Sequence, residues 1–200
     1  MTREADIALN AGGPRRGGWI QTFTGKAFWP LDARADEVDI TDIAHALSML
    51  CRYAGHVRKF YSVAQHCVLM SEAVAPENAL QALLHDATEA YVVDLPTPVK
   101  RYMPDYIATE FDLWQVIAEH FGVDPELPDE VHSADARIVI DERAALMGKV
   151  FRSWGAIDGQ KPLGVEIRSW SPAEAESRYL ERFEILNKTP RTISDRRGGA

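Results

Sequence analysis

The sequence predicts a mostly helical bundle with a short β-hairpin near its N-terminus. Three observations indicate this fold class: apolar residues recur three and four apart over most of the chain, serine-based capping boxes open two segments, and partial alternation is confined to residues 19–29. A spacing of three and four is the period of an amphipathic helix, whereas alternation is typical of strands. The length of 200 residues is that of one domain with short tails.

The two ends of the chain differ in composition from the rest. Residues 1–18 are rich in glycine and arginine and are expected to form a flexible lead. Residues 189–200 are expected to be a flexible tail. One folded domain is therefore predicted over residues 19–188, beginning with a hairpin whose turn is Thr24-Gly25-Lys26.

Helix boundaries are indicated by capping residues, prolines and glycines. Asp39 or Thr41 is expected to cap the first helix. Ser62 with Gln65 and Ser171 with Glu174 form capping boxes, in which each side chain bonds the other's backbone N–H. Prolines and glycines leave residues 152–170 without a helical period. The predicted helices cover residues 41–53, 62–75, 77–92, 105–121, 130–150 and 171–187.

Composition narrows the class of protein. Hydrophobic residues make up 46% of the chain, enough for a globular core, and the net charge of -8 argues against bulk nucleic acid as a partner. The two cysteines, Cys51 and Cys67, lie in apolar surroundings and are expected to be reduced. The sequence has neither an apolar run long enough to span a membrane nor a secretory signal, so a cytoplasmic protein without a membrane partner is predicted.

The segment with the most chemical information surrounds His85 and Asp86. These two strong metal ligands interrupt an apolar run in a predicted helix, and Glu89 follows one turn later, beside both. Three such side chains on one helical surface can share a cation and one of its waters. A lone His-Asp pair also occurs by chance, and a lone glutamate is usually a solvated surface residue.

Two further residues strengthen the metal hypothesis. His66 lies among apolar neighbours near the start of the preceding helix, although alone it would more often be a hydrogen-bonded core histidine. Asp135 lies among small and apolar residues, where a buried carboxylate needs a partner; a cation, Arg137 or a capping contact would serve. His66, His85, Asp86 and Asp135 together suit a divalent Mn, Co, Fe, Ni, Mg or Zn ion with open positions for water and substrate.

The pattern His66, His85-Asp86, Asp135 resembles that of the HD-domain phosphohydrolases, over roughly residues 19–150. It is most similar to the branch that contains bacterial 5′-deoxynucleotidases and phage deoxynucleoside triphosphohydrolases. Four further residues carry this closer similarity: Glu89 three residues after the His-Asp pair, Asp94 eight residues after it, and Arg52-Tyr53 ahead of the first histidine. The resemblance implies an HD-type helical bundle, a divalent metal, a nucleotide substrate and a homo-oligomer.

The resemblance also implies roles for individual residues. Glu89 and Asp86 would be catalytic, with Glu89 a general acid or base, and Asp94 would contact the sugar hydroxyl. Arg52 and Lys100 are candidate phosphate contacts, unless they are merely solvated surface charges. Tyr53 stands where the branch typically has tryptophan, so it stacks on a base or packs in the core, and selectivity for deoxyribose stays open.

Several functions remain open at this level. The proposed activity is hydrolysis that releases phosphate or polyphosphate from a (deoxy)nucleotide, and the basic residues after Pro98 favour a triphosphate. A catalytically silent nucleotide-binding sensor on the same scaffold is one alternative, and a phosphodiesterase acting on another phosphorylated nucleotide is a second. The cyclic-dinucleotide phosphodiesterases carry a Gly-Tyr-Pro motif that this sequence lacks, and alarmone hydrolases normally have further domains.

Overall fold

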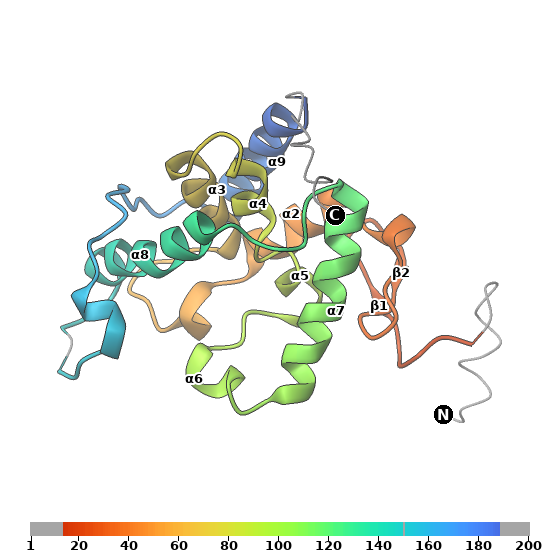
Figure 1. Ribbon diagram of the computed structural model, residues 1–200, viewed down its shortest axis with the longest axis horizontal. Helices are drawn as coiled ribbons and strands as arrows, with labels where there is room; N and C mark the ends of the chain where they lie inside the picture. The colour runs from red at the N-terminus through yellow and green to blue at the C-terminus, as the bar shows by residue number, and fades with distance from the viewer. Residues whose placement is uncertain (1–13, 150, 189–200) are drawn as a thin grey trace, which may run out of the picture.

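The computed structural model describes residues 14–149 and 151–188, and within them it confirms a mostly helical fold with one N-terminal hairpin (Figure 1). Strands β1 (Ile20–Gln21) and β2 (Ala27–Phe28) pair antiparallel. Short 3-10 helices are η1 (Ala35–Glu37), η2 (Arg52–Gly55) and η3 (Gly155–Gly159). The α-helices are α2 (Ile40–Met49), α3 (Val63–Ala73), α4 (Ala79–Leu84), α5 (Glu89–Val92), α6 (Thr97–Lys100), α7 (Pro104–Phe121), α8 (Asp129–Leu146) and α9 (Pro172–Lys188).

Helix α3 is the central element of the bundle. It contacts α2, α4, α8 and α9, and every residue from Val63 to Ser71 is buried. A helix buried on all sides has neighbours all round it rather than on one apolar stripe. The histidine of this helix, His66, is consequently placed in the interior, where the helices that bring the other candidate ligands can reach it.

The predicted N-terminal caps are present. The Asp39 carboxylate accepts a hydrogen bond from the Thr41 N–H at 2.9 Å, and the Ser171 hydroxyl accepts one from the Glu174 N–H at 3.2 Å. Each bond satisfies a backbone donor that has no partner within its own helix. The sequence therefore located the starts of α2 and α9 correctly.

The predicted capping box of α3 is only half present. The Ser62 hydroxyl accepts from the Gln65 N–H at 3.1 Å, but the Gln65 amide does not return to Ser62. It instead donates to the Arg168 carbonyl and accepts from the Trp170 N–H. A buried amide needs partners on both sides, and here they come from the segment that precedes α9, so Gln65 ties that segment to the central helix.

The single helix predicted over residues 77–92 is broken, which corrects the placement of His85 and Asp86 within a helix. Helix α4 ends before His85, residues 85–88 form a turn, and α5 follows. The His85 ring Nδ1–H donates to the Ala82 carbonyl at 2.9 Å and so takes over an acceptor of the last helical turn. At the break in the helix, this hydrogen bond to the backbone fixes the orientation of the His85 ring.

The helix predicted over residues 41–53 ends four residues early. The Val63 N–H donates to the Leu50 carbonyl and the Arg52 N–H donates to the Tyr61 carbonyl, each at 3.0 Å. This short antiparallel pairing takes the backbone groups that a longer helix would use. Arg52 therefore lies in η2, next to the start of α3, rather than at the end of α2.

The longest helices, α7 and α8, have 18 residues each. Helix α8 ends at Leu146 rather than at the predicted residue 150, because the Leu146 carbonyl accepts from the Arg58 N–H at 2.8 Å. Residue 150 itself lies outside the described ranges. Among the helices that these ranges contain, none combines the length and the apolar character needed to cross a bilayer.

The folded part of the chain begins before residue 19. The Arg15 side chain is buried and pairs with Asp32 at 2.8 Å and with Glu37 at 2.7 Å. This ion pair ties the last residues of the predicted lead to η1. The rest of that lead, residues 1–13, and the predicted tail, residues 189–200, lie outside the described residues.

Candidate metal centre and cleft

Backbone strain is concentrated in η2 and at the end of α5. Among the residues that the structure describes, the non-glycine residues with positive φ are Tyr53, Ala54 and Val93. A β-branched residue such as Val93, at φ 65°, is rare in this region and persists only where the surroundings hold it. Tyr53 directly follows Arg52 and Val93 directly precedes Asp94, so the strained positions adjoin two candidate site residues.

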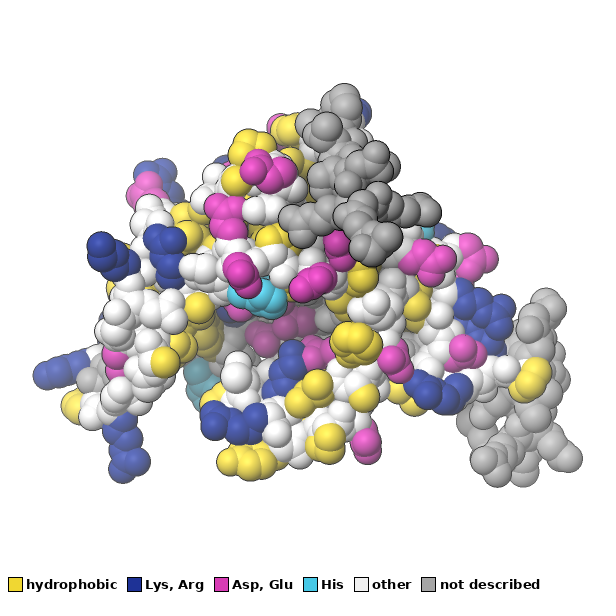
Figure 2. All heavy atoms as spheres, in the orientation of Figure 1, with side chains coloured by type: hydrophobic (Ala, Val, Ile, Leu, Met, Phe, Trp, Pro, Cys, Tyr) yellow, Lys and Arg dark blue, Asp and Glu magenta, His cyan; other side chains and the backbone are white. Residues whose placement is uncertain are grey.

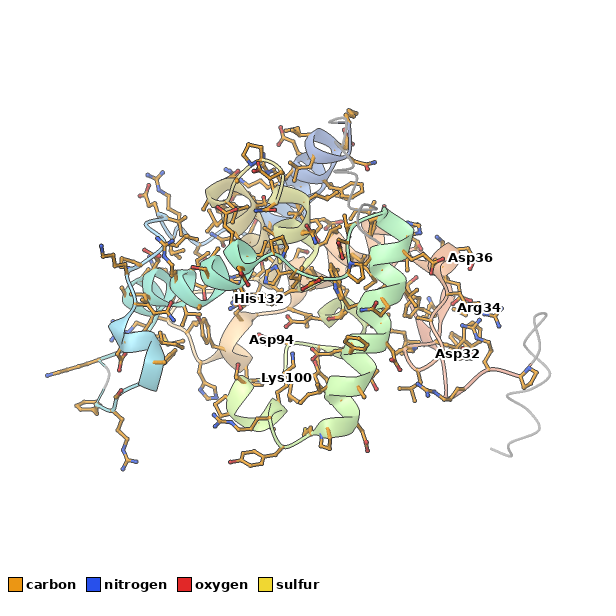
Figure 3. The ribbon with its side chains drawn as sticks, viewed as in Figure 1. Asp32, Arg34, Asp36, Asp94, Lys100 and His132 are labelled. Carbon is orange, nitrogen blue, oxygen red and sulfur yellow. The ribbon has the colours of Figure 1, made fainter. Side chains whose placement is uncertain are left out.

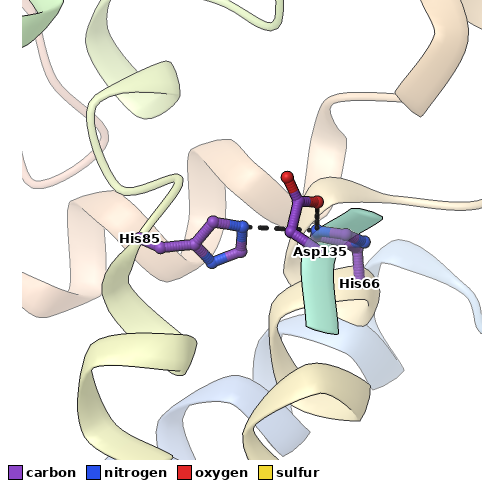
Figure 4. A group of neighbouring side chains, drawn as sticks. All are labelled: His66, His85 and Asp135. Atoms are coloured by element: carbon purple, nitrogen blue, oxygen red, sulfur yellow. Dashed lines mark hydrogen bonds and ion pairs between the residues drawn. The ribbon is translucent and has the colours of Figure 1, made fainter. Parts of the chain in front are cut away.

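The structure brings the four predicted metal ligands together from α3, α8 and the turn after α4. His66, His85 and Asp135 each offer one ligand atom, and these atoms lie within 4.8 Å of one another (Figure 4). The two Nε2 atoms of the histidines are 3.4 Å apart, and Asp135 Oδ1 is 3.3 Å from His66 Nε2. Two ligand atoms on one cation, each about 2.1 Å from it, are separated by about 3.0–3.4 Å.

Asp86, the fourth predicted metal ligand, lies close to both histidines. Its Oδ1 is 3.2 Å from His85 Nε2 and its Oδ2 is 3.6 Å from His66 Nε2. A second group that could hold a cation includes the buried thiol of Cys67 with His85 and Asp86. Burial raises the pKa of Cys67, which disfavours the thiolate that a metal requires. The nitrogen and oxygen set is therefore the better candidate site.

The tautomers of both histidines suit metal binding. His85 Nδ1 contacts a carbonyl oxygen and must donate to it, which leaves a lone pair on His85 Nε2. His66 Nδ1 lies 2.7 Å from Glu142 Oε1, and Arg52 together with His66 outweighs burial and lowers the pKa of Glu142 to about 2. Glu142 is thus ionised and accepts the His66 Nδ1–H. In the neutral form of each ring, both Nε2 lone pairs point to the same place, an arrangement that a cation stabilises.

The carboxylates around His66 also favour a positive charge at the position that the two Nε2 atoms face. Burial and Arg52 lower the pKa of His66, but Glu142 and Asp135 outweigh them and raise the pKa to about 9. Burial raises the pKa of Asp135, but His66, His85 and Arg52 outweigh burial and hold this pKa below the usual range. Protons and divalent cations compete for such a set of donors.

Arg52 links the candidate metal ligands to α8. Its guanidinium lies 3.3 Å from Asp86 Oδ2 and 3.4 Å from Glu142 Oε2. Burial lowers the pKa of Arg52, but Glu142 and the other neighbouring groups raise it well above the ordinary value, so the guanidinium stays charged. A buried charge in a mostly satisfied network holds a fixed position, which places a cationic group beside the candidate metal site.

Glu142 is the residue of this site that sequence reasoning missed. It is fully buried, accepts from the Tyr53 hydroxyl and from His66 Nδ1, and pairs with Arg52. It lies seven residues after Asp135, two helical turns along the same face of α8. That spacing was the available signal, since a second acid on the face of a candidate ligand is a natural outer partner for a metal-bound histidine.

We expect Glu142→Gln to weaken divalent-metal affinity about tenfold to hundredfold, because the amide keeps the shape but loses the ionised acceptor that orients His66. Titration calorimetry with Mn²⁺ measures this effect. Glu72→Gln, which changes an exposed glutamate on α3, is the matched control and should leave the affinity unchanged. Equal affinities for wild type and Glu142→Gln would contradict the positioning role.

The candidate metal site opens into a cleft of about 290 Å³ between the turn after α4 and helix α7. Figure 2 shows this hollow at the centre of the face, with acidic side chains on its floor. The lining residues are His85, Asp86, Thr88, Glu89, Lys100, Ile107, Glu110, Phe111 and Trp114. Six of these residues are polar or charged and three are large and apolar, so the lining suits a small molecule that has both a polar and an apolar part.

Glu89 lies in this cleft with an unusual protonation preference. Its side chain is buried, and among the described residues its Oε2 has no hydrogen-bond partner. Burial, together with Asp86 and Asp94, raises the pKa of Glu89 well above the ordinary value of 4.5. A buried carboxyl group that holds its proton more tightly than usual is suited to proton donation.

Lys100 lines the cleft, and Asp94 lies close enough to act electrostatically on Glu89. Figure 3 shows both side chains in the space between α8 and α6. Burial and Asp86 outweigh Arg52 and raise the pKa of Asp94. Lys100 Nζ is 2.5 Å from Glu110 Oε2, so its charge already has a partner.

Tyr53, by contrast, is held by protein contacts. Its hydroxyl donates to Glu142, and its ring lies against the Arg52 guanidinium and the Trp154 ring, with centroid distances of 5.4 and 6.4 Å. This placement favours the packing alternative for Tyr53 over stacking on a base.

The fold and the site define a helical protein with a candidate divalent-metal centre at the floor of a small-molecule cleft. No family model matches the chain. The uncharacterized protein YfdR of Escherichia coli is 40% identical over 171 residues, which cover 85% of this chain and 96% of YfdR. The chain therefore belongs to the same family as YfdR. An uncharacterized protein of Rhodobacter capsulatus is 29% identical over 186 residues, 84% of this chain and 95% of the relative.

A second set of relatives carries a functional name. The 5′-deoxynucleotidase of Erwinia tasmaniensis is 34% identical over 121 residues, which cover 56% of this chain and 52% of that protein. The 5′-deoxynucleotidase YfbR of Salmonella typhi is 36% identical over 123 residues, 58% of this chain and 53% of YfbR. The match spans about half the length of these nucleotidases.

Proposed function

We propose that the protein is a metal-dependent phosphohydrolase of the HD type, which releases phosphate from a (deoxy)nucleoside monophosphate. The observation that carries this proposal is the convergence of two imidazole Nε2 atoms and the carboxylates of Asp86 and Asp135 beside a cleft that also contains Glu89. The partial similarity to proteins named 5′-deoxynucleotidase supports the reaction class.

The donor set fits a divalent cation, because both histidines donate Nδ1–H elsewhere and present Nε2 to the same position. Such a cation supplies Lewis-acid stabilisation of the phosphoryl oxygens and makes a nearby water more acidic. Two imidazoles and two carboxylates hold Mn, Co, Fe, Ni, Mg or Zn, with positions left for other ligands.

The chain's own groups would perform the remaining steps. Arg52 beside Asp86 would donate to phosphate oxygens, and Asp94 would accept from a sugar hydroxyl. Water would attack phosphorus while the ester P–O bond breaks, and the Glu89 carboxyl would give a proton to the leaving oxygen. Of the two protons of the attacking water, one stays on the released phosphate and the other restores the proton on Glu89.

Charge in the cleft favours a monophosphate over the triphosphate that the sequence suggested. Lys100 is neutralised by Glu110, and Arg101 is exposed with its guanidinium over the Tyr102 ring. Arg52 faces two carboxylates of its own. A triphosphate would place several negative charges in a cleft lined by Asp86, Glu89 and Glu110, and such like-charge contacts are costly.

A substrate panel tests the proposal. We expect phosphate release from deoxynucleoside monophosphates with Mn²⁺ or Co²⁺, loss of activity after chelation, and recovery when the ion is restored. Ribo- and deoxynucleotide mono-, di- and triphosphates are compared by assaying phosphate, pyrophosphate and triphosphate. Release of triphosphate from a nucleoside triphosphate as the main reaction would contradict the preference for a monophosphate. No turnover on any nucleotide, with tight binding retained, would instead identify a silent sensor.

A further inference from the structure

One side of α7 exposes large apolar side chains that no other residue of the described ranges covers. Ile107 is 43% exposed and Phe111, one turn further along, is 63% exposed. Residues four apart lie on the same helical face, so the two side chains form one continuous surface. Burial of this surface would be favourable, which indicates that a ligand or partner covers it.

The position of these side chains favours a small ligand as the occupant. Ile107 and Phe111 line the same cleft as His85, Asp86 and Glu89, rather than a surface remote from it. Trp114, one turn beyond Phe111, lies buried at the base of this wall, and its indole N–H donates to the Pro125 carbonyl at 2.7 Å. The cleft thus has a polar floor and an apolar wall built on an anchored helix.

Two of the charged groups beside that wall are paired with each other. Lys100 and Glu110 both line the cleft, and their charged atoms are 2.5 Å apart. A ligand ring that lies against the wall would therefore meet apolar contacts rather than free hydrogen-bonding groups. Aromatic stacking accepts any base, because every base has a π-face.

We infer that Phe111, supported by Ile107, holds the nucleobase of the substrate while its phosphate lies at the His66, His85, Asp86 and Asp135 group. This inference rests on the proposed function, and it assigns a base-binding surface to α7. This surface distinguishes nucleotides from sugar phosphates because only nucleotides carry an aromatic base. It discriminates weakly between purines and pyrimidines.

The test compares Phe111→Ala with wild type on deoxyadenosine monophosphate, thymidine monophosphate and deoxyribose phosphate, which has no base. We expect KM for both nucleotides to rise about fivefold to hundredfold, with kcat nearly unchanged and no change on the sugar phosphate. Phe111→Trp should restore the nucleotide KM. Phe151→Ala is the matched control, since Phe151 is 89% exposed and is not among the residues that line the cleft.

Equilibrium binding of the same three compounds by calorimetry separates this inference from the proposed function. If wild type turns over no substrate, the proposed function fails, and selective loss of nucleotide binding in Phe111→Ala still supports the base surface. Unchanged nucleotide KM and affinity in Phe111→Ala, or an equal loss on deoxyribose phosphate, would overturn the inference. Dissociation of a wild-type dimer by Phe111→Ala would also overturn it, because the occupant would then be a second copy of the chain.

Discussion

Asp86→Asn is expected to lower phosphate release by on the order of a thousandfold or more, because metal-assisted charge stabilisation contributes several kcal/mol to such reactions. Asp86 is the ligand candidate that touches both histidines and also faces Arg52. The amide keeps the volume of the side chain and removes the charge that holds the cation. Both turnover and Mn²⁺ affinity should therefore fall together, as measured by phosphate release and calorimetry.

The control for this variant is Asp36→Asn. Asp36 is an exposed residue of η1, and Figure 3 shows it at the edge of the molecule, away from the centrally placed Asp94 and Lys100. The same chemical change there should leave turnover and Mn²⁺ affinity unaltered. Circular dichroism and thermal unfolding show whether each variant remains folded. A folded Asp86→Asn protein with wild-type activity would remove Asp86 from the metal site.

Glu89→Gln is expected to lower kcat about a hundredfold to ten-thousandfold while leaving Mn²⁺ affinity near that of wild type. Glu89 lies in the cleft with His85 and Asp86 but has no place in the groups of close metal-ligating atoms that the described residues form. The amide fills the same space and cannot transfer a proton. Separate measurement of kcat and metal affinity distinguishes this role from that of Asp86, for which both quantities should fall.

The raised pKa of Glu89 also predicts how Glu89→Gln changes the pH dependence of stability, which is measured independently of kcat. Because burial, Asp86 and Asp94 raise this pKa in the folded state, the folded protein binds more protons than the unfolded chain once the pH exceeds about 4.5. Glu89 therefore reduces stability as the pH rises from that value through its folded pKa. Glu89→Gln should raise the melting temperature at alkaline pH more than at acidic pH. An equal rise in melting temperature at acidic and alkaline pH would contradict the raised pKa of Glu89.

Much of this architecture could be predicted from local pattern. Asp39, Ser62 and Ser171 were identified as caps because a side chain acts on backbone groups two or three residues away. The apolar setting of His66 predicted its burial, and the structure places it in the core. The hairpin near residues 19–29 was likewise visible as alternation around Gly25.

Predictions failed where a distant segment competed for backbone groups. The pairing of Leu50 with Val63 ended α2 early, and the Arg58 N–H ended α8 at Leu146. The periodicity of one segment carries no information about such partners, since it reports only which face of that segment is apolar. The turn at residues 85–88 also depended on a ring bond that helical spacing does not predict.

The sequence by itself determined which side chains have the chemistry for a metal site: His66, the His85-Asp86 pair and Asp135. The expected burial is confirmed for His66, whereas the Asp135 side chain is 48% exposed. Only the tertiary structure decided that His66, His85 and Asp135 converge and that Asp86 lies beside both histidines. The tertiary structure likewise decided that Glu142 contacts His66 and that Phe111 lines the cleft. The physical reason is that local composition sets the face on which a side chain lies. The packing of α3, α7 and α8 sets which faces meet.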